Sequence, residues 1–97
     1  MLQLLNYKKA IATNNMETIT ELSFFTVTDL WEKRQEIFKD SSVSLKNITK
    51  VDASGIAFLA IWAKSLQGSK LKLEHVPNNV LNLIDTYKLN ELFIIEN

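Results

Sequence analysis

Few residues in this chain have side chains and spacing suited to chemistry, and two of them lie in the stretch VDASG at residues 51–55. Ser54 carries a hydroxyl and Asp52 a carboxylate. A serine nucleophile needs a base held beside it, and the sequence has neither a G-x-S-x-G motif nor more than one histidine. That histidine, His75, occupies an alternating segment that predicts a partly buried structural role. We therefore expect a protein that is not an enzyme.

Metal and cofactor sites are not expected either. A single histidine and the absence of cysteine leave too few ligands for a histidine- or thiolate-based metal site. The two glycines, Gly55 and Gly68, are too few for a glycine-rich phosphate-binding loop. The sequence therefore predicts no cofactor and no metal.

The position of Ser54 at the start of an apolar run has two interpretations. The first amides of a helix lack intrahelical partners, and either Ser54 or Asp52 can accept from them as an N-cap, which contributes about 1 kcal/mol. The same helix start would also accommodate a phosphate on Ser54, although the charge of Asp52 would oppose it. The local pattern permits both a cap and a phosphorylation switch, and we expect Ser54 to be the capping residue.

Length, composition and charge narrow the class of protein. The 97 residues fit one domain, and 46% apolar with 23% charged residues is typical of a folded chain. Eleven basic and eleven acidic residues cancel and are scattered, so a nucleic-acid partner is not expected. The sequence shows no signal-peptide pattern, and its longest apolar run, residues 56–63, is far shorter than the roughly 20 residues that span a bilayer. With no cysteine, these features favour a cytoplasmic protein.

Hydrophobic periodicity predicts alternating strands and helices. The first half of the chain is expected to form a hairpin of residues 2–12 and 16–20, a helix from about Thr26 with Thr26 or Thr28 as its cap, and a strand from Val43. The second half is expected to form a helix over 54–67 ended by Gly68, a strand over 70–76, a helix opened by Pro77, and a short final strand or turn in LFIIEN. This order predicts an α/β sandwich, in which helices pack on a central mixed, mostly parallel sheet with an N-terminal hairpin.

The helix after VDASG is apolar around its whole circumference. One stripe, suited to face the sheet, consists of Ile56, Leu59, Ala60, Ala63 and Leu66. Phe58, Ile61 and Trp62 fall on the opposite side, where a surface helix is normally polar. Large side chains there either anchor a partner protein or wedge between neighbouring helices as ordinary core. Both interpretations remain open for Phe58 and Trp62.

The segment NITKVDASGIAFLAIWAKSLQ, residues 47–67, resembles the central motif of STAS domains, in which a strand leads through a D-[ST]-[SAG]-G turn into an apolar helix. The flanking segments LWEKRQEIF and VPNNVLNLIDTYKLNELF are similar to the first and third helices of the small STAS subunit of the bacterial Mla transporter. That transporter is an ABC system that moves phospholipids between the two membranes of Gram-negative envelopes. The resemblance covers roughly residues 17–93 and implies one STAS domain over residues 1–97.

The resemblance implies a protein that binds another protein. In the transporter subunit the region of the turn and the following helix contacts the ATPase, which here corresponds to Asp52, Ala53, Ser54, Gly55, Phe58, Ile61 and Trp62. The implied role is to stabilise or activate that ATPase, in the cytoplasm and at the inner membrane only through the complex, without direct lipid binding. In the related anti-anti-sigma factors the serine before the glycine, here Ser54, is phosphorylated, which is the alternative function.

Two positions depart from the family pattern. The transporter subunit has a threonine directly after the aspartate, at its contact with the ATPase, whereas this chain has Ala53. Alanine neither donates nor accepts a side-chain hydrogen bond. A contact at this turn would therefore use the hydroxyl of Ser54 or packing by the helix. Residues 20–23, TELS, also stand where the family more often has a glycine and acidic residues.

Overall fold

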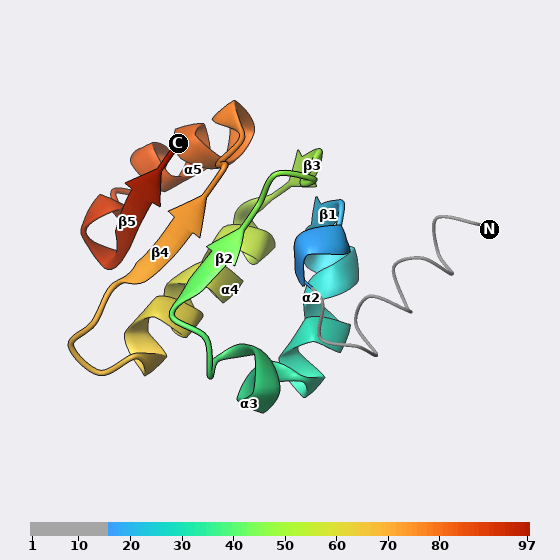
Figure 1. The fold of residues 1–97 in the computed structure, drawn as a ribbon. Helices are drawn as coiled ribbons and strands as arrows, with labels where there is room; N and C mark the ends of the chain where they lie inside the picture. Colours follow the sequence, from blue (N-terminus) through green and yellow to red (C-terminus); the bar gives the residue numbers. More distant parts are fainter. Residues whose placement is uncertain (1–15) are drawn as a thin grey trace.

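The structure is a computed structural model that describes residues 16–97 (Figure 1). Its elements, in chain order, are η1 (Met16–Thr18), β1 (Glu21–Leu22), α2 (Phe24–Glu32), α3 (Arg34–Ile37), β2 (Ser42–Ser44), β3 (Lys50–Val51), α4 (Ala53–Ser65), β4 (Leu71–Glu74), α5 (Asn78–Thr86), η2 (Asn90–Leu92) and β5 (Phe93–Glu96). Strands and helices alternate, as the periodicity predicted, which confirms the α/β class.

All strand pairs in the described part of the chain are parallel. The strands β2, β4 and β5 form one sheet in that order, and β1 pairs with β3 beyond the end of β2. In Figure 1 the helices α4 and α5 lie behind β2, β4 and β5. The connections between parallel neighbours run through helices, which cover this face of the sheet.

The predicted sheet and its N-terminal hairpin both differ from what the described residues show, and the single central mixed sheet is observed as two separate parallel sheets. The first segment of the hairpin, residues 2–12, lies outside the described residues. Its second segment, residues 16–20, is not a strand, because Met16–Thr18 form the helical turn η1. This turn places Met16 and Ile19 on the buried side, with the amide of Ile19 donating to the carbonyl of Met16 at 3.2 Å. The strand β1 follows it and pairs in parallel with β3.

The starts of two helices also differ from the prediction. The helix α2 begins at Phe24 and is capped by Ser23, whose hydroxyl accepts from the amide of Phe25 at 3.2 Å. Thr26 completes a capping box by accepting from the amide of Ser23 at 3.0 Å, so neither Thr26 nor Thr28 is the N-cap. The helix α5 begins at Asn78, with Pro77 at the N-cap position.

The turns after α4 and β4 use the left-handed backbone region. Gln67 and Gly68 follow α4 with φ values of 45° and 91°, which agrees with the predicted stop at Gly68. His75 follows β4 with φ of 51° and is exposed. The predicted burial of His75 is therefore wrong, because the strand ends at Glu74 and the left-handed backbone at His75 breaks the alternation of buried and exposed side chains.

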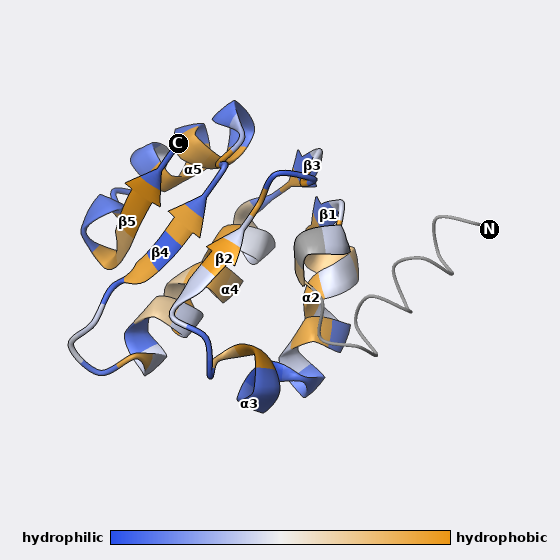
Figure 2. Ribbon diagram, in the orientation of Figure 1, coloured by the Kyte–Doolittle hydropathy of each residue, from blue (hydrophilic) through white to orange (hydrophobic). Residues whose placement is uncertain are grey.

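The hydrophobic core lies between the sheet and the helices. Figure 2 shows apolar residues recurring along β2, β4 and β5. Leu71 and Leu73 of β4 are fully buried, as are Ile56 and Leu59 of α4. The central position of α4 decides which of its residues remain available for function.

Candidate docking surface

Asp52 joins the starts of two helices. Its Oδ1 accepts from the amide of Gly55 at 3.1 Å and so caps α4, while its Oδ2 accepts from the amide of Phe24 at 3.0 Å at the start of α2. The hydrogen bond from Phe24 holds the pKa of the Asp52 carboxyl below its ordinary value; partial burial opposes this, and the amides of Gly55 and Ser54 add to it. One carboxylate thus fixes α2 relative to α4.

Ser54 and Ala53 occupy the first turn of α4. The predicted capping role of Ser54 is wrong, because Asp52 is the N-cap of α4 and Ser54 lies in its first turn. The Ser54 side chain is half-buried, and within residues 16–97 its hydroxyl forms no hydrogen bond. Ala53 is exposed. The turn therefore presents one unengaged hydroxyl and one methyl group to the surface.

Gly55 allows α4 to approach β1 closely. A Cβ atom at this position would lie 2.0 Å from the carbonyl oxygen of Leu22 and 2.9 Å from its Cγ. The same carbonyl accepts from the amide of Asp52 at 3.2 Å. Gly55 is thus required for packing of backbone against backbone, and its own atoms are buried.

Phe58 and Trp62 are core residues, each only 1% exposed. The indole of Trp62 stacks on Phe38, with ring centroids 5.8 Å apart, and its Nε1 donates to the carbonyl of Asp40 at 2.9 Å. Phe58 packs against the same Phe38 ring at 5.5 Å. The expected contact of these two side chains with a partner is therefore not supported, because α2, α3 and the segment after them cover this side of α4.

A narrow strip of α4 remains exposed and lines an open groove. The groove has a volume of about 420 Å³, is almost entirely apolar, and is lined by Ala53, Ile56, Ala57, Ala60, Ile61, Lys64, Tyr87 and Leu89. Ile61 is 44% exposed and Tyr87 is 48% exposed, although both are large and apolar. Of the three large residues expected on the outer side of this helix, only Ile61 lies at the surface.

The contribution of the segment after α5 was missed by sequence reasoning. Tyr87 falls at helical spacing from Val80, Leu83 and Ile84, yet it lies at the C-cap of α5, directly before Lys88 with φ of 57°. That left-handed turn ends the helix, and Tyr87 and Leu89 on either side of it line the groove with α4. The sequence has no glycine after Gly68 that would mark the end of this helix, and Lys88 takes the left-handed conformation instead.

Phe24 and Phe25 form a second exposed apolar feature, which sequence reasoning also missed. They are 67% and 78% exposed and contact each other edge to face, with ring centroids 5.9 Å apart. Since the amide of Phe24 is bonded to Asp52, the aromatic pair begins beside the turn from which the groove extends. Two consecutive phenylalanines directly after a serine cap were the available signal.

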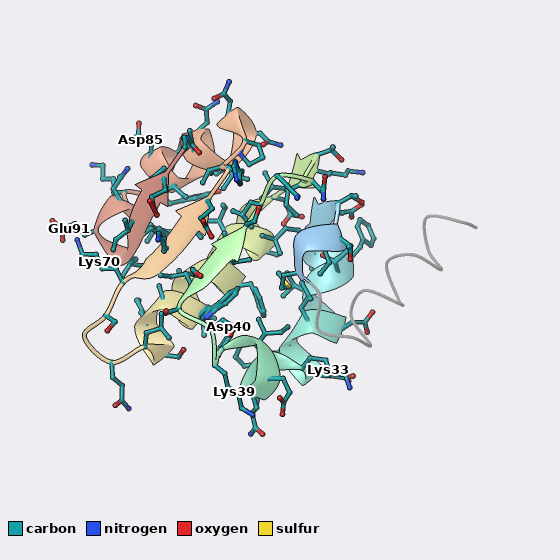
Figure 3. All side chains as sticks on the ribbon, viewed as in Figure 1. Lys33, Lys39, Asp40, Lys70, Asp85 and Glu91 are labelled. Carbon is teal, nitrogen blue, oxygen red and sulfur yellow. The ribbon has the colours of Figure 1, made fainter. Side chains whose placement is uncertain are left out.

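The charged side chains in the described part of the chain do not gather into a metal-binding cluster. Within it, no three histidine, cysteine, aspartate or glutamate residues are placed to share a metal ion. Figure 3 shows labelled charged side chains on two sides of the molecule: Lys70, Asp85 and Glu91 lie on the left of the view, whereas Lys33, Lys39 and Asp40 belong to the α2–α3 region and the segment after it. The groove and the aromatic pair are exposed apolar features, and exposed apolar surface of this kind is suited to binding.

Two further findings concern membrane-spanning helices and similarity to known proteins. Over residues 16–97, none of the helices combines the length and hydropathy of a membrane span. No family model matches the chain, and the search of curated proteins returned no match.

Proposed function

We propose that the chain is a non-enzymatic, STAS-like docking domain that binds the ATPase of a phospholipid-transporting ABC complex and stabilises or activates it. The observation that carries the proposal is the apolar groove on the exposed strip of α4, directly after the D-A-S-G turn. This is the region through which the resembling family binds its partners. The chain would reach the membrane only through this ATPase, without binding lipid itself.

The side chains along the groove suit a packing contact. Ala53 and Ala57 are small and exposed, so a partner element can approach the backbone of α4 closely. Ile61 and Tyr87 supply the large apolar surface that a partner would bury. At about 25 cal/mol per Å² of apolar surface, full burial of an isoleucine contributes about 1.5 to 3 kcal/mol. Since Ile61 is 44% exposed, roughly half of this free energy would be gained when a partner buries it. Ala53 in place of threonine fits a contact made by packing.

The test is to co-express the protein with the ATPase subunit of such a transporter from the same host and measure co-purification. Replacing Ile61 with Asp places a charge in the groove and is expected to abolish the complex, while circular dichroism stays unchanged. Trp62 is unsuitable for this test because its loss would disturb the core. The matched control is Ile94→Asp, at an isoleucine of similar exposure on β5. A complex that survives Ile61→Asp, or that fails equally in the control, would contradict docking at the groove.

A second function, that of a phosphorylation-controlled anti-anti-sigma factor, is favoured by Ser54. Asp52 takes the capping role, which leaves the half-buried Ser54 hydroxyl without a hydrogen bond in the described part of the chain. The test is intact-mass spectrometry of the protein isolated from its native host, followed by fragmentation to locate any phosphate. Phosphate on Ser54 supports this second function, and its consistent absence across growth conditions counts against it.

A further inference from the structure

The strand β5 lies at the edge of its sheet. The strand order is β2, β4, β5, so β5 pairs with β4 on one side, and on the other side no strand of residues 16–97 pairs with it. In Figure 1 it is the outermost strand on the side of the molecule opposite β1 and β3. An unpaired edge presents backbone donors and acceptors to any strand that can align with it.

The register shows which backbone groups face outward. Glu96 is opposite Glu74, and its carbonyl accepts from the amide of His75 at 3.1 Å, so the backbone of Glu96 points toward β4. Because successive residues alternate, Ile94 also points its backbone toward β4, and Ile95 points its N–H and C=O outward. Ile95 is therefore the residue that can exchange two hydrogen bonds with another strand.

The side chains of β5 lack the usual protection of an edge. Ile94 is 49% exposed and Ile95 is 37% exposed, on opposite faces of the strand. The strand contains no lysine and no proline, which commonly block edge pairing. Its only charged side chain, Glu96, is in an ion pair with Lys72 at 2.7 Å, so its charge is partly neutralised. Nothing on this edge repels a second apolar strand.

We infer that the outer edge of β5 pairs with the β5 strand of a second copy of this chain. In an antiparallel arrangement centred on Ile95, each Ile95 exchanges both backbone hydrogen bonds with the Ile95 of the other copy. The two Ile95 side chains then lie on the same face and extend the core across the two-fold axis. On the other face each Ile94 packs beside Glu96 of the other copy, and the two sheets become one six-stranded sheet.

Self-pairing is favoured over other occupants by this symmetry. Both sides of the pair present the same short, apolar and nearly neutral strand, so no complementary charge is needed from a partner. The contact is small, because one strand of four residues buries much less than the roughly 1,200 Å² of a stable interface. The dimer is therefore weak and forms with rising concentration. It is independent of the proposed docking groove, since it involves none of the groove residues.

The test combines sedimentation velocity with amide NMR spectra over a dilution series from about 10 μM to about 1 mM, where weak interfaces associate. The wild type is expected to show a rising sedimentation coefficient and concentration-dependent shifts of the Ile95 amide, while the inward amide of Ile94 shifts less. Ile95→Pro removes the outward N–H together with the isoleucine side chain, and it deletes neither backbone hydrogen bond to β4, because residue 95 makes none of them. It is expected to weaken dimerisation at least about ten-fold, the effect of losing roughly 1.4 kcal/mol.

Two further variants keep the interpretation unambiguous. Ile95→Lys retains the outward N–H but places like charges of the two copies near the two-fold axis. If Ile95→Pro weakens dimerisation by preventing strand pairing, Ile95→Lys should weaken dimerisation as well. Ile61→Lys, in the groove, should leave dimerisation unchanged. The inference is overturned if the wild type stays monomeric throughout, or if both Ile95 variants dimerise like the wild type. It is also overturned if Ile61→Lys alone abolishes association, which would assign self-association to the groove.

Discussion

Replacing Gly55 with Ala tests how closely α4 approaches β1. In an ordinary helix this substitution stabilises the protein by about 0.5 to 1 kcal/mol, because alanine loses less backbone entropy on folding. Here the new Cβ would lie 2.0 Å from the carbonyl oxygen of Leu22, more than an ångström short of an ordinary contact. That carbonyl cannot turn away without losing its hydrogen bond from the amide of Asp52. We therefore expect a net loss near the upper end of the overpacking range, about 3 kcal/mol.

Urea denaturation followed by circular dichroism measures this loss as a lower transition midpoint at unchanged slope. The control is Ala57→Gly, at an exposed position of the same helix, which should lose only the helix-propensity difference of about 1 kcal/mol. If Gly55→Ala is as stable as the wild type, or more stable, then α4 does not approach Leu22 in the way the structure shows. The reasoning about the D-A-S-G turn would then be wrong.

Three further predictions concern the core, the cap and the aromatic pair. Trp62→Ala should lower the free energy of unfolding by about 3 to 5 kcal/mol in urea denaturation, and a near-neutral result would mean that Trp62 is not core. Asp52→Asn should cost about 0.3 to 1 kcal/mol at pH 7, because asparagine caps a helix about as well as aspartate but lacks the negative charge that is favoured at a helix N-terminus. The folded pKa of Asp52 lies below its ordinary value of 3.8. The stability difference between wild type and variant should therefore be complete above pH 3.8 and disappear as the pH falls through the folded pKa. A stability difference that is the same at every pH would exclude the charge of Asp52 as its cause. Phe25→Ser should change stability by less than about 0.5 kcal/mol and weaken ATPase co-purification, whereas an unchanged complex would place Phe25 outside the contact.

The alternation of strands and helices could be predicted because most elements carry a clear apolar period. The strand β4 alternates buried and partly buried residues, and α5 buries Val80 and Ile84 at helical spacing. The start of α2 could not be located in this way, because Phe24 and Phe25 in its first turn are apolar but exposed. An apolar pattern marks a helix boundary only where apolar residues are buried.

The candidate site was less predictable, because it depends on contacts between distant parts of the chain. The sequence favoured Ser54 as the cap, whereas Asp52 takes that role and its second oxygen bonds to Phe24, which is 28 positions away. A helical projection gave the helix over 54–67 an inner and an outer side. In the structure α4 is covered by the sheet, by α2 with α3, and in part by α5, so Trp62 is buried and only a narrow strip remains exposed.

The position of Asp52 links the two proposed functions of the turn. The amides of Ser54 and Gly55 at the start of α4 already interact with the Asp52 carboxylate. A phosphate on Ser54 would compete for these amides and repel that carboxylate, since both are anionic. Displacing Asp52 would also release the amide of Phe24, which its other oxygen accepts. Phosphorylation at Ser54 would therefore alter the start of α2 and the exposed phenylalanine pair as well as the groove. Through these changes, a phosphate on one hydroxyl would control docking.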